Sequence, residues 1–214
     1  MEKAKKVINY YVLCNKLKDV IRTGWKDWNV KRERVESVAE HIFGVEMLAI
    51  AMNSEFDYKI DIEKVIYMIA IHELGEIIIG DLTSFEITRE EKKKIEHKAV
   101  HTILEELIDG NHIEELFLEF DEHETAESKF AYQCDKLECD LQCKLYDEEN
   151  CVDFENQKEQ REKEFASTKE HLENSTTWSE AWLKNDLKAI NYDDNFQEIM
   201  NYALENKIGA NNEK

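Results

Sequence analysis

Proline is absent from the 214-residue sequence, and glycine occurs only six times. Because proline marks turns and strand edges and glycine supplies the positive φ angles of tight hairpins, both deficits argue against a fold built of β-hairpins. Long helices joined by short polar turns fit both deficits. No uninterrupted apolar run reaches the ~18 residues of a membrane span. The first six residues are polar, so we expect no secretory signal, no membrane partner and a cytoplasmic protein.

Cationic residues are also scarce, with 28 Lys and Arg against 48 Asp and Glu and a formal net charge of −20. A surface of this charge repels the nucleic-acid backbone, so a polymeric nucleic-acid partner is disfavoured. Three arginines, Arg22, Arg32 and Arg34, nevertheless lie close together in the sequence. This segment is either a solvated loop or a capture site for a small anionic substrate. The odd count of five cysteines predicts reduced thiols rather than a disulfide framework.

Helical periodicity and capping signals predict an all-α fold without a confident strand. Capping boxes at Ser37–Glu40 and Thr88–Glu91 begin two of the helices, and Asp61 begins a third that is expected to continue to Gly80. Residues 23–35 are expected to form a loop. The helices are expected over residues 5–22, 38–53, 62–79, 89–110 (ending at Gly110), 112–122 (capped by Asn111), 125–149, 154–173, from Thr177, and 195–207.

A composition shift near residue 152 predicts the domain organisation. We expect a core over residues 1–152 and a C-terminal helical appendage over residues 153–214 that packs on it, with the last residues frayed.

The strongest chemical signal is His72-Glu73-Leu-Gly-Glu76, in the middle of the helix expected to be the most buried. Burying unpaired ionisable groups costs several kcal/mol, on the order of 2–7, so these groups need compensation. His72 and Glu73 can converge on one ion, and Glu76 follows one helical turn later. His41 and Asp135 can add ligands from two other helices. Two imidazoles and two carboxylates suit a divalent Mn, Fe, Co, Ni or Zn ion, unless these four residues are merely buried and hydrogen-bonded.

Several stretches of the sequence resemble the HD-domain superfamily of metal-dependent phosphohydrolases. They are most similar to the small 5′-deoxynucleotidase family, and they occur in the same order over residues 22–145. The matching stretches are Arg22–Trp25, Glu36–His41, His72–Glu76, Gly80–Leu82, Ala126–Phe130 and Cys134–Glu138.

The resemblance implies a helical bundle, often dimeric, which hydrolyses 2′-deoxyribonucleoside 5′-monophosphates to nucleoside and phosphate. We therefore expect a homodimer that acts on a small nucleotide. By resemblance the metal ligands are His41, His72, Glu73 and Asp135, with Glu73 standing where the family has aspartate. By the same resemblance Glu76 is a general acid/base, Asp81 a second acidic residue of the reaction centre, Arg22 a phosphate-binding residue and Trp25 a residue that crowds the sugar.

Two other functions stay open: a catalytically weakened HD scaffold that binds a nucleotide or a partner, and a nucleotide phosphodiesterase. A metalloprotease lacks its second histidine, and a di-iron bundle lacks its Glu-x-x-His motifs. Asp81 could equally cap a turn, and Trp25 could equally cover the core. His97 and His101 have metal-ligand spacing on a lysine-rich helix, where a structural role is favoured.

Overall fold

The computed structural model describes residues 1–83, 86–155 and 171–209, and the chain divides into two compact units. Unit 1 contains Met1–Gly24 and Glu36–Tyr132, and unit 2 contains Trp25–Val35 and Gln133–Lys214. Every regular element among the described residues is a helix, apart from one isolated antiparallel β-bridge between Ile21 and Ser37. The predicted all-α fold is therefore confirmed, whereas the domain boundary near residue 152 stays a prediction.

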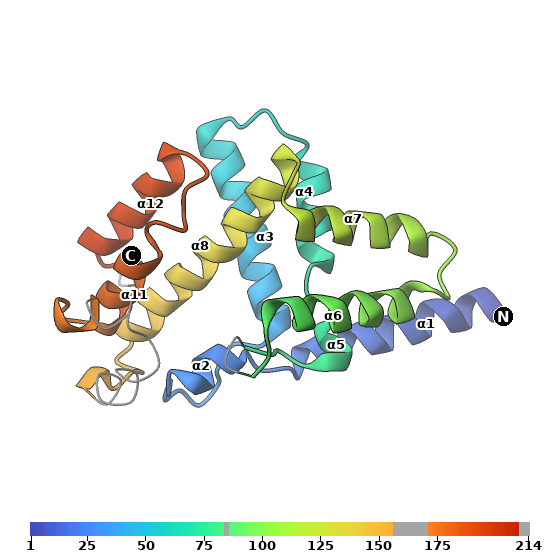
Figure 1. Ribbon diagram of the computed structural model, residues 1–214, viewed down its shortest axis with the longest axis horizontal. Coiled ribbons are helices and arrows are strands. Elements are labelled where there is room, and N and C mark those ends of the chain that lie inside the picture. Colours follow the sequence, from blue (N-terminus) through green and yellow to red (C-terminus); the bar gives the residue numbers. More distant parts are fainter. Residues whose placement is uncertain (84–85, 156–170, 210–214) are drawn as a thin grey trace, which may run out of the picture. The chain divides into compact units, whose positions relative to one another are not determined.

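Unit 1 is a set of packed helices in which α4 contacts both α3 and α7, and α6 contacts both α5 and α7 (Figure 1). Its interior is made of fully buried aliphatic side chains such as Val45 on α3 and Met68 and Ile69 on α4. The elements of this unit are α1 (Glu2–Cys14), the 3-10 helix η1 (Asn15–Lys18), α3 (Val38–Phe56), α4 (Ile62–Ile71), α5 (Glu76–Ile79), α6 (Arg89–Leu104) and α7 (Gly110–Glu122). Helices α2 (Thr23–Asp27) and α8 (Ala126–Glu148) each run across the boundary between the units.

The two predicted capping boxes are confirmed. The Ser37 hydroxyl accepts a hydrogen bond from the Glu40 backbone N–H, and a Glu40 carboxylate oxygen accepts the Ser37 N–H at 3.0 Å. Thr88 and Glu91 repeat this arrangement at the start of α6. Because each box satisfies two N–H groups that have no partner within the helix, both helices begin where the sequence predicts.

The helix expected from Asp61 to Gly80 is not continuous, and this prediction was wrong. Helix α4 ends at Ile71, a turn follows, and α5 begins at Glu76. The N–H groups of Leu74 and Glu76 donate to the carbonyls of Ile71 and Glu73, three residues back rather than four. Apolar residues continue in phase across this turn, so periodicity could not reveal it. His72 and Glu73 therefore lie at the end of a buried helix and not in its middle.

Three other expectations were inaccurate in smaller ways. The first helix stops at Cys14, and the expected loop contains α2. Gly110 begins α7, with Asp109 at the N-cap position in place of Asn111. A Cβ atom at Gly110 would lie 2.2 Å from the carbonyl oxygen of Leu104, so glycine is required by this close approach.

Unit 2 is organised around an aromatic cluster. Trp25, Tyr146 and Trp178 are at most 2% exposed, and the ring centroids of Trp25 and Tyr146 lie 5.3 Å apart in an edge-to-face arrangement. Trp28 and Trp182 cover the same cluster. Helix α11 (Trp178–Asp186) begins at the predicted Thr177 cap, and α12 (Asp194–Glu205) corresponds to the last expected helix. The expected helix over 154–173 and the frayed end fall largely on residues 156–170 and 210–214, outside the described residues.

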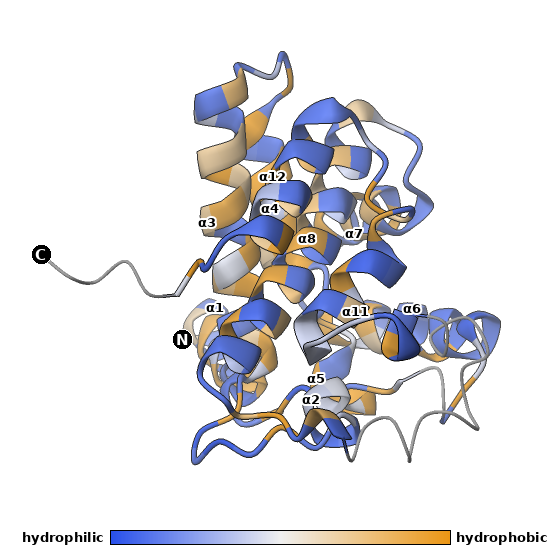
Figure 2. Cartoon of the chain, turned by 90° about the vertical axis from the view of Figure 1, so that its left-hand side faces the viewer, coloured by the Kyte–Doolittle hydropathy of each residue, from blue (hydrophilic) through white to orange (hydrophobic). Residues whose placement is uncertain are grey.

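Hydrophobic and hydrophilic residues alternate around the helices (Figure 2). Across the described residues, none of the helices combines the length and the apolar character needed to span a membrane.

Unit 2 contains a carboxyl pair made of the buried Asp140 and the half-buried Asp186. Asp140 is 1% exposed and accepts a hydrogen bond from the Trp182 indole N–H at 2.8 Å. Its other oxygen, Oδ2, is buried and has no hydrogen-bond partner among the described residues. Burial, and then the neighbouring Asp186, raise the pKa of Asp140 well above its usual range, and burial raises the pKa of Asp186 too. Asp140 therefore keeps a proton in the folded protein under conditions in which the unfolded chain has lost it.

This pair makes the stability of unit 2 dependent on pH. Because the folded protein binds the Asp140 proton more tightly, stability falls as the pH rises from the ordinary carboxyl range towards the raised pKa. Asp140→Asn keeps an oxygen that can accept the Trp182 hydrogen bond and has no proton to lose, so it removes this fall in stability with pH. We expect the variant to gain about 1–2 kcal/mol in the free energy of unfolding at pH 8 and little at pH 4.

The measurement is urea denaturation followed by tryptophan fluorescence, since all four tryptophans (Trp25, Trp28, Trp178 and Trp182) lie in unit 2. The exposed Asp19→Asn serves as the control and should leave the pH dependence unchanged. An Asp140→Asn variant with the wild-type pH dependence would contradict the assignment.

Candidate metal centre

Three of the predicted metal ligands meet within unit 1. His41 lies on α3 and is fully buried, whereas His72 and Glu73 come from the turn after α4. One ligand atom from each of the three lies within 4.8 Å of the others, and the two imidazole centroids are 5.7 Å apart. Ligands that bind one ion at ~2.0–2.2 Å must lie within about 4.4 Å of one another, so this spacing is close to what a shared ion requires.

The orientation of His72 fits metal binding. Its Nδ1 lies 2.6 Å from the carbonyl oxygen of Ile69, and because a carbonyl only accepts, Nδ1 must carry the proton. In the neutral imidazole Nε2 has the free lone pair that a metal needs, and it lies 3.5 Å from Oε1 of Glu73. Metal-ligating histidines commonly donate their second ring N–H to such a carbonyl, which fixes both the tautomer and the ring. Two imidazoles and a carboxylate thus fit a divalent transition metal.

The predicted phosphate-binding arginine lies beside this cluster. Nη1 of Arg22 is 3.4 Å from Oε1 of Glu73, and the next residue, Thr23, donates its backbone N–H to Asp81 at 2.6 Å. Arg22 and the first residue of α2 therefore contact the segment from Glu73 to Asp81 at two points. The contact with Thr23 lets Asp81 cap the start of α2, a role that the sequence did not predict, and its predicted role at the reaction centre stays a prediction.

Glu76, the predicted acid/base, is buried at the start of α5 and is 1% exposed. Its Oε1 accepts a hydrogen bond from Nζ of Lys92 at 3.1 Å. Burial, and then the negative charges of Glu73 and Asp81, raise the pKa of Glu76 well above its usual range, against the opposing effects of Lys92 and Arg22. A carboxyl group held in this way can carry a proton at a pH where an exposed glutamate is ionised.

Sequence analysis missed two residues of this site, Lys92 and Glu96 on α6. Burial lowers the pKa of Lys92, but the carboxylates of Glu76, Glu73 and Glu96 outweigh this effect and raise it above its usual value. Burial and Glu73 raise the pKa of Glu96 to about 7. Lys92 and Glu96 are four residues apart on a helix with a clear capping box. This spacing places them on the same helix face, which could have been read from the sequence.

Two predicted site residues belong to unit 2. Asp135 lies on α8 three residues beyond the boundary, is 7% exposed, and has Nζ of Lys136 at 3.0 Å. Its role as a metal ligand stays a prediction. Trp25 is 2% exposed and packs in the aromatic cluster, as expected of a residue that covers the core, and its contact with a sugar stays a prediction.

The two histidines with metal-ligand spacing on α6 both pair with carboxylates of α7. His97 lies 2.8 Å from Asp121, and His101 lies 3.0 Å from Glu114. These ion pairs agree with the structural role that was favoured for both histidines.

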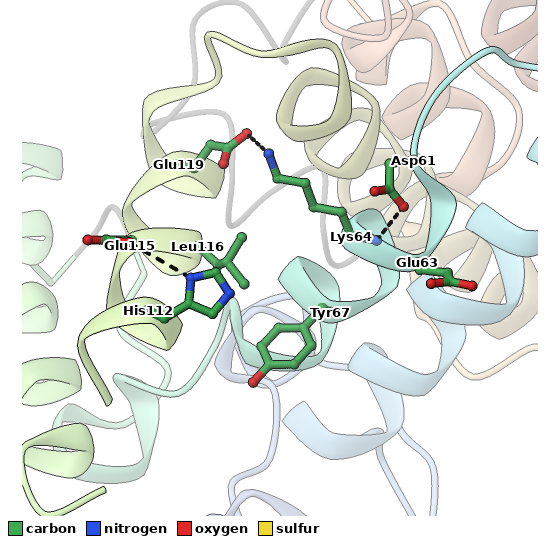
Figure 3. Close-up of a pocket in the computed structure, with 8 residues that line it drawn as sticks. All are labelled: Asp61, Glu63, Lys64, Tyr67, His112, Glu115, Leu116 and Glu119. Atoms are coloured by element: carbon green, nitrogen blue, oxygen red, sulfur yellow. Dashed lines mark hydrogen bonds and ion pairs between the residues drawn. The ribbon is translucent and has the colours of Figure 1, made fainter. Parts of the chain in front are cut away.

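A hollow of about 460 Å³ also lies between α4 and α7 in unit 1 (Figure 3). Its charged groups are largely paired with each other, Lys64 with Glu119 and His112 with Glu115. The hollow contains none of the predicted site residues.

Comparison with known families assigns the chain to a class. The HD-domain family model matches residues 14–177, which is most of the chain, and the protein therefore belongs to the HD-domain family. Among characterised relatives, the 5′-deoxynucleotidase HDDC2 of Dictyostelium discoideum is 33% identical over 66% of this chain and 78% of its own length. The 5′-deoxynucleotidase hdd1 of Schizosaccharomyces pombe is 32% identical over 64% of this chain and 70% of its own. The chain is thus a hydrolase of the 5′-deoxynucleotidase group.

Solved structures agree on the fold. A protein from Pyrococcus horikoshii aligns with a TM-score of 0.67 at 22% identity, covering 92% of this chain and 98% of its own. A predicted metal-dependent phosphohydrolase from Magnetospirillum magnetotacticum aligns with a TM-score of 0.65 at 18% identity, covering 96% and 95% of the two chains. At these identities the comparison extends to the fold alone.

The turn that carries His72 and Glu73 depends on close packing against α6. A Cβ atom at Gly75 would lie 2.4 Å from Cγ and 3.4 Å from Cα of Glu96. We therefore expect Gly75→Ala to lower the free energy of unfolding by about 1–3 kcal/mol, because the added methyl group has no space. Thermal denaturation measures this loss. Gly24→Ala is the control, since a Cβ there meets nothing within 4 Å.

If the clash with Glu96 is the cause, the double variant Gly75→Ala/Glu96→Ala should recover most of the lost stability. A Gly75→Ala protein as stable as the wild type would show that this contact does not constrain the turn.

Proposed function

We propose that this protein hydrolyses 2′-deoxynucleoside 5′-monophosphates to nucleoside and phosphate with the help of a divalent metal ion. The observation that carries the proposal is the convergence of His41, His72 and Glu73 beside a buried Glu76 in a chain of the HD-domain family. The names of three relatives, each a 5′-deoxynucleotidase, support the choice of substrate class.

His41, His72 and Glu73 would hold the metal, and we propose Asp135 of α8 as the fourth ligand. A bound Mn, Fe, Co, Ni or Zn ion would supply a more acidic water molecule and would neutralise charge on the phosphate. The ion is divalent in this proposal, and the choice among these metals is left to experiment.

The chain's own residues divide the remaining tasks. Arg22, already beside Glu73, binds the phosphate through charge-assisted hydrogen bonds. Glu76 moves the proton that the reaction needs, to the leaving 5′-oxygen or from the attacking water, because its raised pKa lets it hold a proton at a pH where an exposed glutamate has lost it. Asp81 fixes the segment after Arg22 through the Thr23 N–H. Trp25 is proposed to limit the space at the sugar 2′ position.

We further propose a cytoplasmic homodimer. All five cysteines are unpaired, which fits a protein of a reducing compartment. Helix α1 has no buried residue and exposes Val7, Ile8, Tyr11 and Val12, each more than 50% accessible. Helix α3 exposes Phe43, Met47 and Ile50. Apolar side chains in such numbers on two helices of unit 1 support burial against a second copy.

A phosphate-release assay tests the function. We expect phosphate from deoxynucleoside 5′-monophosphates in the presence of Mn, Co or another of the proposed metals, and none after chelation. Release from cyclic or diester nucleotides alone would favour a phosphodiesterase. Nucleotide binding without turnover under every metal would favour a weakened scaffold.

Two variants separate metal binding from catalysis. His72→Ala should lose bound metal and turnover together, whereas Glu76→Ala should keep the metal and lose about 10²–10⁴-fold in kcat. Metal content by mass spectrometry and steady-state rates distinguish the two. Turnover retained by either variant would count against the assignment.

The dimer is tested by light scattering during gel filtration. The wild type should have twice the 25.4 kDa mass of one chain. Tyr11→Glu places a charge on the exposed face of α1 and should produce monomers, whereas Tyr202→Glu on α12, at a similarly exposed tyrosine, should not. A wild-type protein that elutes with the mass of one chain would overturn the dimer proposal.

A further inference from the structure

Lys92 is the one residue of α6 with a hydrogen bond from its side chain to the proposed acid/base, among the contacts given for the described residues. Its Nζ lies 3.1 Å from Oε1 of Glu76, whose side chain is fully buried, and the lysine side chain is itself 27% exposed. Oε2 of Glu76 is also buried and has no hydrogen-bond partner among the described residues. One oxygen of the Glu76 carboxyl group therefore accepts a hydrogen bond from Lys92, whereas the other has no such partner.

The position of Lys92 is well defined by its helix. Thr88 is the N-cap of α6, and its capping box with Glu91 fixes the helix start at Arg89, so Lys92 lies in the first turn of the helix. Glu73 and Glu96 also attract the ammonium group. A lysine on a rigid helix end, surrounded by carboxylates, can hold one carboxylate oxygen in place.

We propose that Lys92 is a positioning residue that anchors Oε1 of Glu76 and thereby makes Oε2 the oxygen that exchanges the proton. The inference rests on the proposed role of Glu76 as acid/base. Lys92 acts through Glu76 and does not touch the substrate in this proposal.

Direct phosphate binding by Lys92 is the competing interpretation, and the surrounding charge argues against it. The groups that most strongly affect Lys92 are the carboxylates of Glu76, Glu73 and Glu96, which repel a phosphate dianion. Arg22, whose Nη1 lies 3.4 Å from Oε1 of Glu73 beside the proposed metal ligands, is the better phosphate ligand. The two roles differ in kinetics, because a lost phosphate contact raises KM, whereas a misplaced acid/base lowers kcat.

The test compares Lys92→Met with Lys93→Met, a neighbour on the same helix that pairs with Asp121. In the metal-loaded enzyme we expect Lys92→Met to lower kcat about 10- to 100-fold, with KM and metal content within about 2-fold of the wild type. Lys92→Arg should recover most of the rate, and Lys93→Met should match the wild type. Lys92→Gln, which keeps an N–H donor without the charge, should be intermediate and serves if Lys92→Met does not fold.

Crystal structures of the same variants give a readout that does not depend on activity. Glu76 should change rotamer in Lys92→Met and keep its position in Lys93→Met. A Lys92→Met enzyme with raised KM and unchanged kcat, or one with Glu76 unmoved and full activity, would overturn the inference. If the wild type releases no phosphate, the proposed function fails, and the Glu76 rotamer still decides whether Lys92 positions it.

Discussion

The concentration of carboxylates around one buried turn is the constraint on which the site depends. Glu73, Glu76 and Glu96 present ligand atoms within 4.8 Å of one another, in surroundings that raise the pKa of both Glu76 and Glu96. Such a group is costly to bury unless cations or protons compensate it. Arg22 and Lys92 supply the positive charges, each from a separate part of unit 1. The positive charges of Arg22 and Lys92 thus compensate the buried carboxylates, and in the proposed reaction the same two residues bind phosphate and position Glu76.

The break between α4 and α5 gives this cluster its geometry. On a continuous helix, His72 and Glu73 would diverge by ~100° around one axis. The turn instead ends α4 at Ile71 and starts α5 at Glu76, so that the ligands and the acid/base belong to consecutive short elements. Gly75 lets α6 approach closely enough for Lys92 to reach Glu76. The interruption of the helix between Ile71 and Glu76 is thus part of how the site is assembled.

The sequence predicted the helical class and both capping boxes, because these signals are local, but it did not predict the turn that carries His72 and Glu73. Ser37 with Glu40 and Thr88 with Glu91 act within four residues, and the HD resemblance lies in short stretches. Lys92 escaped prediction because its significance comes from a contact with Glu76, 16 residues earlier, across a turn that periodicity does not reveal. Gly110 was misassigned for a similar reason, since its closeness to Leu104 is set by packing and not by its neighbours in sequence.

The glutamate at position 73 is compatible with this arrangement. A glutamate side chain is longer than the family's aspartate by one methylene, which is ~1.5 Å of additional reach. Oε1 of Glu73 nevertheless lies 3.5 Å from Nε2 of His72 and 3.4 Å from Nη1 of Arg22. Two ligand atoms at ~2.1 Å from one ion are about 3 Å apart when they subtend a right angle at the ion. The distance between Nε2 of His72 and Oε1 of Glu73 is close to this value, as expected of two atoms that share a metal ion. The longer side chain therefore keeps a carboxylate oxygen beside the imidazole while it also reaches the arginine that would bind phosphate.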